Sequence, residues 1–175
     1  MDLAQLVVFV FPAWLAKAVP VVFGGGNRID WGKKFWDGQP VFGKSKTWRG
    51  LYSGMAFGFA SGAVIVAFFN EFYLAGYSVY EKLYLAFLLS LGAMLGDLLG
   101  SFIKRRRGFK EGRPSLVMDK LVFVATALGL CVAYSPPLWA EIGWTGLAFI
   151  LALTYALHVF FNALAHRLKL KSVPW

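Results

Sequence analysis

The side chains best suited to chemistry surround one basic segment in the middle of the chain. Asp97 precedes this segment and Asp119 follows it. On a helix, Asp97, Ser101 and Lys104 share one face, because they are four and seven residues apart. A carboxylate that holds a cation, beside a hydroxyl and an ammonium that bind phosphate oxygens, would suit a metal–phosphate complex. The segment itself carries six positive charges: Lys104, Arg105, Arg106, Arg107, Lys110 and Arg113.

The composition indicates that these residues belong to a membrane protein. Of 175 residues, 58% are hydrophobic and only 15% are charged, whereas a soluble domain averages about 45–50% apolar and about 25% charged. The formal net charge of +9 is gathered in a few segments between long apolar runs. This distribution favours anionic lipid or phosphate partners at a membrane surface and argues against nucleic acid.

Five apolar segments approach the ~20 residues that a membrane-spanning helix needs. An open sheet cannot satisfy its backbone hydrogen bonds in hydrocarbon, so all five are expected to be helical. The prediction is an all-α integral membrane protein, one transmembrane catalytic domain over residues 1–175. Its bundle of five transmembrane helices comprises Leu3–Phe23, Leu51–Phe69, Leu83–Ile103, Leu116–Tyr134 and Ile142–Leu164.

Lysine and arginine gather in two long loops, about residues 24–50 and 104–115, and in the C-terminal tail. The connections 71–82 and 135–141 hold one basic residue between them. By the positive-inside rule, the N-terminus is outside, and both long loops and the C-terminus are cytoplasmic. The prediction is a multi-pass protein of the cell membrane with its active site on the cytoplasmic face.

Two of the expected helices carry glycine every fourth residue. Residues 50, 54, 58 and 62 form one stripe and residues 92, 96 and 100 form another. Small residues at this spacing allow helix backbones to approach closely in lipid. We therefore expect both glycine faces to pack inside the bundle.

Ionisable groups within membrane spans are expensive and are functional candidates. Asp97 and Asp119 both fall at the cytoplasmic edge, where either could form an ion pair that ties helices together. Two acids facing many basic residues favour a magnesium site with Asp97 and Asp119 as ligands. Zinc is disfavoured because the chain has one cysteine and no cysteine–histidine cluster. Lys17, late in the first span, either extends toward the membrane surface or binds a lipid phosphate.

The first loop adds a second set of phosphate-binding candidates. Thr47 can cap the second span, whose N-terminal N–H groups and helix dipole favour an anion. Lys46 and Arg49 flank that end. The starts of spans two and four and the end of span three could thus gather around one polyphosphate.

Two functions fit this inventory. Phosphoryl or nucleotidyl transfer needs mainly positioning and charge neutralisation, which these residues supply. A small anion or phospholipid transporter would use the basic loops as a vestibule. A transporter should also carry polar groups through the bilayer midplane, whereas here they crowd one face, and this favours the enzyme.

The chain resembles the CDP-archaeol synthases and, more distantly, the phosphatidate cytidylyltransferases. The resemblance rests on the run Gly96–Arg106 with Gly112, Arg113, Pro114 and Asp119, and in the first loop on Asn27, Asp30, Gly32, Asp37, Gly38, Gly43 and Lys46–Gly50. One departure concerns the metal: the family pattern after Asp119 usually runs D-Q-L-D-F, and Val122 stands where the second acid is expected.

The resemblance implies a magnesium-dependent cytidylyltransferase of membrane phospholipid biosynthesis. Its partners would be CTP, membrane lipids and an isoprenoid ether-lipid phosphate, 2,3-bis-O-geranylgeranyl-glycerol 1-phosphate, and its products CDP-archaeol and pyrophosphate. Asp97, Asp119 and Lys104 would be catalytic, with both acids on Mg²⁺. The nucleotide- or phosphate-binding residues would be Lys46, Thr47, Arg49, Ser101, Arg105, Asn27 and Asp37.

Overall fold

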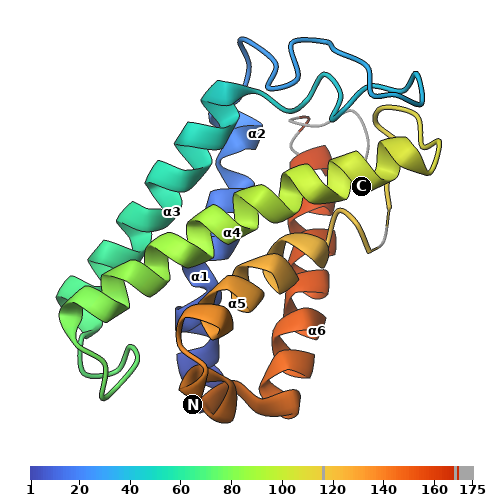
Figure 1. Ribbon diagram of the computed structural model, residues 1–175. Coiled ribbons are helices and arrows are strands. Elements are labelled where there is room, and N and C mark those ends of the chain that lie inside the picture. The colour runs from blue at the N-terminus through green and yellow to red at the C-terminus, as the bar shows by residue number, and fades with distance from the viewer. Residues whose placement is uncertain (116, 168, 170–175) are drawn as a thin grey trace.

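The computed structural model describes residues 1–115, 117–167 and 169. Within them the fold is helical, as predicted, apart from two isolated β-bridges in the first long loop, Arg28 with Thr47 and Lys34 with Pro40. The helices are drawn in Figure 1; their bounds are α1 Leu3–Ala18, α2 Pro20–Phe23, α3 Trp48–Phe69, α4 Val79–Arg106, α5 Val122–Tyr134 and α6 Pro137–Arg167.

Polar side chains fix where the helices begin. The Asp2 carboxylate accepts the Gln5 N–H at 2.7 Å before α1. The Ser78 hydroxyl accepts the Glu81 N–H at 3.3 Å before α4. Each cap satisfies an N–H group that has no partner within its own helix.

Four helical stretches are long and apolar enough to cross a membrane in the part of the chain described: Leu3–Phe23, Trp48–Phe69, Val79–Arg106 and Pro137–Leu164. The predicted fourth span is wrong at its start, because residues 117–121 form turns and α5 begins only at Val122. With 13 residues, α5 is about 20 Å long, short of the ~30 Å hydrocarbon core.

Local hydrogen bonds explain the late start of α5. The Asp119 carboxylate accepts the Ser115 N–H at 2.8 Å, and the Ser115 hydroxyl accepts the Met118 N–H at 3.3 Å. Short polar side chains that bind nearby backbone in this way compete with helix formation. Apolar content alone therefore overestimated the length of this helix. The last span also begins earlier than predicted, at Pro137, with a break at Gly143 (φ 59°).

Both glycine stripes pack inside the bundle, as predicted. A Cβ on Gly58 of α3 would lie 2.6 Å from the Ser90 hydroxyl of α4 and 2.8 Å from the Pro12 carbonyl of α1. On α4, a Cβ at Gly92 would lie 2.6 Å from the Ala127 Cα of α5. Close backbone approach thus brings α1, α3 and α5 around α4.

The two ends of the bundle differ, as the loop charges predicted. The Met1 ammonium donates to the Glu141 carbonyl at 3.1 Å, so the N-terminus lies beside the α5–α6 connection. Both long loops meet at the other end (Figure 1), where the Lys44 N–H donates to the Glu111 carboxylate at 3.1 Å. Which end faces the cytoplasm stays a prediction.

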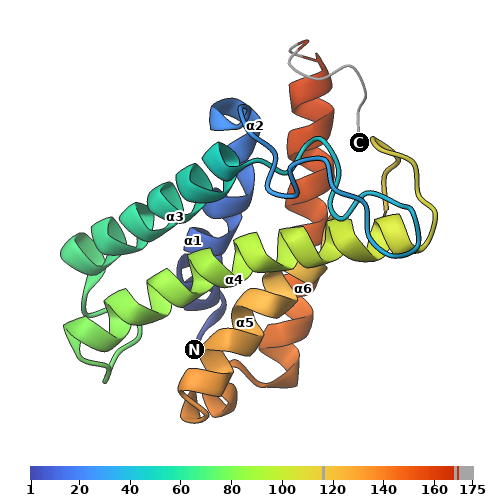
Figure 2. The same ribbon diagram turned by 45° about the horizontal axis from the view of Figure 1, so that its top comes forward.

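Helix α6 packs against the bundle over only its first half. Leu138, Ile142, Ile150 and Thr154 are buried, and the Trp14 indole N–H donates to the Thr154 hydroxyl at 2.9 Å. After Thr154, none of the α6 side chains that the structure describes is buried. Figure 2 shows this second half rising past α5 toward the end with the long loops.

Candidate active site

Asp97 of α4 lies between two lysines. The Lys17 ammonium of α1 contacts one carboxylate oxygen, and the Lys46 ammonium, just before α3, contacts the other. The Asp97 side chain is only 12% exposed. Three separate parts of the chain thus converge on one largely shielded carboxylate in the second half of α4.

Asp119, whose side chain is 32% exposed, forms the second ion pair. The Lys104 ammonium donates to both of its carboxylate oxygens, at 2.8 and 3.0 Å. Burial raises the pKa of Asp119, but the Lys104 and Ser115 hydrogen bonds outweigh it, and the pKa lies below its ordinary value. The charge of Lys17 contributes to this lowering, so Lys17 acts on both carboxylates.

Lys46 connects the two pairs electrostatically. Burial lowers its pKa to about 8. The charge of Asp119 opposes that shift, while those of Lys104 and Arg105 add to it. Lys46 thus interacts with groups of both ion pairs, and we treat these residues as one neighbourhood.

This neighbourhood has more positive than negative groups. Arg105 is 6% exposed, and its Nε has no hydrogen-bond partner in the part of the chain described. A buried donor without a partner costs roughly 1–3 kcal/mol, so an anion with several oxygens would stabilise it. We call the two carboxylates and their cations the charged cluster: Asp97, Asp119, Lys17, Lys46, Lys104 and Arg105.

The predicted cap by Thr47 is confirmed. Its hydroxyl accepts the N–H groups of Gly50 at 3.1 Å and Gly25 at 3.3 Å. Beside it lies a cavity of about 40 Å³, lined in part by Lys46, Gly50 and Asp97. That volume suits a few water molecules, so a nucleotide can enter only if side chains or loops move.

Asp30 organises the first loop. Its buried carboxylate accepts three backbone N–H groups, from Gly32 at 2.9 Å and from Phe42 and Gly43 at 3.0 Å. Burial raises its pKa, but these hydrogen bonds prevail and lower it. Hydrogen bonds to this single side chain therefore hold together the loop that leads to Lys46.

Arg106, at the end of α4, contacts the same loop. Its Nε lies 2.8 Å from an Asp37 carboxylate oxygen, and its Nη2 donates to the Pro40 carbonyl at 2.5 Å. Its guanidinium carbon is 4.8 Å from the ring centres of both Phe35 and Phe102. Asp37 thus has a structural partner, and its predicted contact with the nucleotide stays a prediction.

The structure gathers some predicted site residues and separates others. Asp97, Asp119, Lys104, Lys46 and Arg105 lie in the charged cluster, with Thr47 beside it. The predicted common target of Asp97, Ser101 and Lys104 is not seen, because Lys104 pairs with Asp119. Ser101 is half-buried on α4, while Arg49 and Asn27 are exposed near the start of α3.

Three residues of this region were absent from the predicted site: Lys17, Asp30 and Arg106. A signal existed for Lys17, because a cation within a span needs an acid at the same depth. Asp30 and Arg106 carry no such signal, since their roles depend on a loop conformation that spacing does not reveal.

The donor set fits magnesium only if substrate supplies further oxygens. Among the described residues, no three His, Cys, Asp or Glu side chains come together as a metal site. Magnesium characteristically takes one or two carboxylates and completes its shell with water and substrate phosphates. Asp97 and Asp119 match that pattern, and the predicted site remains a prediction.

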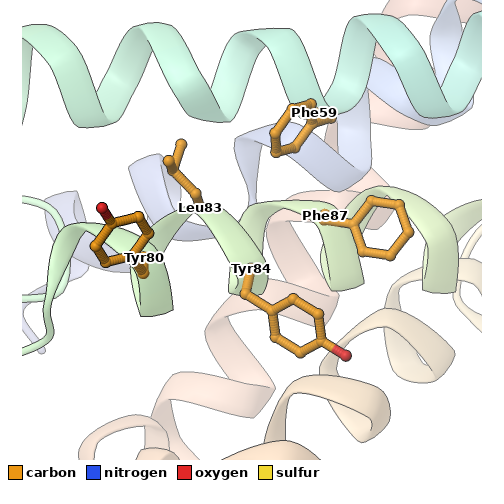
Figure 3. A pocket seen from close by; sticks show the side chains of 5 residues that line it. All are labelled: Phe59, Tyr80, Leu83, Tyr84 and Phe87. Carbon is orange, nitrogen blue, oxygen red and sulfur yellow. The ribbon is translucent and has the colours of Figure 1, made fainter.

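A second cavity lies between the middle of α3 and the first half of α4, away from the charged cluster. It has a volume of about 290 Å³ and is lined by Phe59, Tyr80, Leu83, Tyr84 and Phe87 (Figure 3). The Phe59 and Phe87 rings meet edge to face, 6.3 Å apart. Its lining offers apolar contact but no charge for a phosphate.

Long apolar helices around the charged cluster define a multi-pass membrane protein. A solved structure described as an intramembrane enzyme for archaeal membrane lipids biosynthesis is similar, with a TM-score of 0.69 and 31% identity. The alignment covers 90% of this chain and 95% of that one.

The CDP-archaeol synthase family model (CarS-like) matches residues 2–175. The CDP-archaeol synthases of Pyrococcus abyssi and Archaeoglobus fulgidus are 42% and 40% identical, each alignment covering 95% of this chain and 95% or 94% of the relative. The chain belongs to the CDP-archaeol synthase family. The predicted family is confirmed, and with it an enzyme rather than a transporter.

Proposed function

We propose that this protein transfers CMP from CTP to an unsaturated archaeal ether-lipid phosphate and releases pyrophosphate. The observation that carries the proposal is the charged cluster, which holds four cations against two carboxylates at the loop end of the bundle. Its excess positive charge suits a triphosphate and a phosphomonoester brought together. Membership of the CDP-archaeol synthase family supports the nucleotide and the lipid.

In the proposed reaction, an oxygen of the lipid phosphate attacks the α-phosphorus of CTP. The new bond is the P–O–P link of the CDP-lipid, and the bond to the β-phosphate breaks. The electron pair of that bond leaves with pyrophosphate. No residue forms a covalent bond, since positioning and charge neutralisation account for such transfers.

The chain's own groups have distinct tasks. Lys46, Lys104 and Arg105 neutralise phosphate oxygens as charge develops on the leaving group. Asp97 and Asp119 would hold Mg²⁺, which supplies charge stabilisation across phosphate oxygens. Asp97 already binds cations with both oxygens; Lys46 would give way to the metal and turn toward phosphate, while Lys17 would stay on the carboxylate.

The charged cluster would face the cytoplasm, where CTP is available. The basic loops at this end support that orientation by the positive-inside rule. The first loop, held by Asp30 and Arg106, would receive the nucleotide.

Pyrophosphate release by the purified protein tests the proposal. We expect release only when CTP, the lipid phosphate and Mg²⁺ are all present, and little with ATP, GTP or UTP. The lipid product should contain one CMP for each pyrophosphate. Pyrophosphate release without lipid phosphate, or equal rates with all four nucleotides, would overturn it.

A further inference from the structure

The two lysines on Asp97 come from different environments. Lys17 belongs to the last turn of α1, inside the apolar stretch Leu3–Phe23. Lys46 belongs to the long polar loop that precedes α3. One carboxylate therefore holds a cation from the membrane-spanning region on one oxygen and a cation from the loop on the other.

The unpacked half of α6 begins beside Lys17. The hydrogen bond from Trp14 to Thr154 fixes α6 against α1 one turn before Lys17. The Lys120 ammonium, next in sequence to Asp119, lies 4.2 Å from the centre of the Tyr155 ring. Beyond these two contacts no described α6 side chain is buried, and Phe160 and Phe161 are 60% and 57% exposed.

A phosphate carried on isoprenoid chains must approach within the bilayer, whereas CTP approaches from water. The lipid thus needs a cation at the membrane side of the site, next to an apolar surface that the bundle leaves uncovered. We infer that Lys17 binds the phosphate of the lipid substrate, which enters between α1 and the second half of α6. This inference rests on the proposed function and assigns the two substrates to different sides of Asp97.

The chemistry of the ammonium permits this role without loss of Asp97. A lysine has three N–H donors, so one ammonium can bind a carboxylate and a phosphate oxygen together. The Nζ also lies 5.7 Å from the centre of the Phe123 ring of α5, a contact that favours a cation there. Lys17 can therefore stay on the carboxylate while it donates to a phosphate oxygen.

The test compares Lys17→Gln, Lys46→Gln and the control Arg107→Gln, which removes an exposed charge at the same end of the bundle. For Lys17→Gln we expect the KM for lipid phosphate to rise roughly ten- to hundredfold, the size of one lost charged hydrogen bond. The KM for CTP should stay within about twofold. For Lys46→Gln the larger change should be in the KM for CTP, and Arg107→Gln should match the unmodified protein.

Binding of lipid phosphate without nucleotide gives a second measurement. Lys17→Gln should weaken it by a similar factor and leave binding of the uncharged ether lipid unchanged, while Lys17→Arg should recover much of the affinity. Equal effects on both substrates, or an effect on CTP alone, would overturn the role of Lys17, as would unchanged lipid binding in Lys17→Gln. If instead the unmodified protein forms no CDP-lipid, it is the proposed function that fails.

Discussion

At the scale of single residues, the site is organised by ion pairs between lysines and two aspartates. Neither Asp97 nor Asp119 is an isolated acid, because lysines contact all four of their carboxylate oxygens. Such pairs hold the lysines close to where phosphate would bind. They also mean that a change to one partner leaves the other charge without its counter-ion.

Lys104→Gln tests this pairing. Without the ammonium, the Asp119 carboxylate keeps only the Ser115 N–H, and we expect unfolding to become easier by about 1–2 kcal/mol, the low range for charged hydrogen bonds, because Asp119 is partly exposed. CMP transfer should be lost. Thermal unfolding in detergent and the transfer assay measure the two effects, and Lys110→Gln, an exposed lysine beyond α4, is the control. Unchanged stability and activity would contradict the pairing.

Asp30→Asn tests the loop. An amide keeps one acceptor oxygen and turns the other position into a donor, so it cannot accept all three N–H groups. We expect faster amide hydrogen exchange in residues 30–43, a higher KM for CTP and unchanged exchange in the helices. Exchange rates equal to those of the unmodified protein would exclude the role of Asp30.

The same carboxylate gives the loop a pH dependence. The pKa of Asp30 is lower in the folded protein than its ordinary value of 3.8. The contribution of Asp30 to the stability of the folded loop is therefore complete above pH 3.8 and is lost as the pH drops through the folded pKa. The protection factors of the loop amides, which correct for the intrinsic pH dependence of exchange, should therefore fall at acidic pH in the unmodified protein and depend less on pH in Asp30→Asn.

At the scale of elements, α4 is the part against which the others are placed. Its glycine face lies against α5, and the glycine face of α3 lies against α4 and α1. These contacts bring the start of α3, the end of α4 and the turns before α5 to one end of the bundle.

Gly58→Ala is expected to disturb this packing. The new methyl group would lie 2.6 Å from the Ser90 hydroxyl and 2.8 Å from a carbonyl of α1, and overpacking of this kind costs roughly 1–3 kcal/mol. Gly129→Ala in α5, whose methyl group would have nothing within 4 Å, should be neutral or slightly stabilising. Thermal unfolding compares the two, and equal midpoints would contradict the packing.

Much of this arrangement is predictable from sequence. Apolar length located the helices, glycine spacing identified their contact faces, and loop charge placed both basic loops at one end. The start of α5 was missed because hydrogen bonds around Asp119 override apolar content. The partners of Lys104 and Lys17 were missed because periodicity places residues on one helix, whereas Lys17 and Lys104 pair with residues outside their own helices.

At the scale of the whole molecule, the charge distribution predicts how the protein lies in the membrane. Both basic loops should be cytoplasmic, with the N-terminus and the α3–α4 connection outside. A cysteine replacing Lys44 and one replacing Glu71, each in a Cys131→Ala background, report the two ends; both sites are exposed. In intact cells a membrane-impermeant maleimide should label position 71 and leave position 44 unlabelled. The reverse pattern would invert the orientation.

The central claim is that Asp97 and Asp119 form the reaction centre of a CTP-dependent lipid-phosphate transferase. The most direct measurement is incorporation of labelled CMP into lipid by Asp97→Asn, Asp119→Asn and the control Glu71→Gln, an exposed acid at the opposite end. Both aspartate variants should lose at least about a hundredfold in rate while remaining folded, and Glu71→Gln should match the unmodified protein. Full activity in either aspartate variant would contradict the claim.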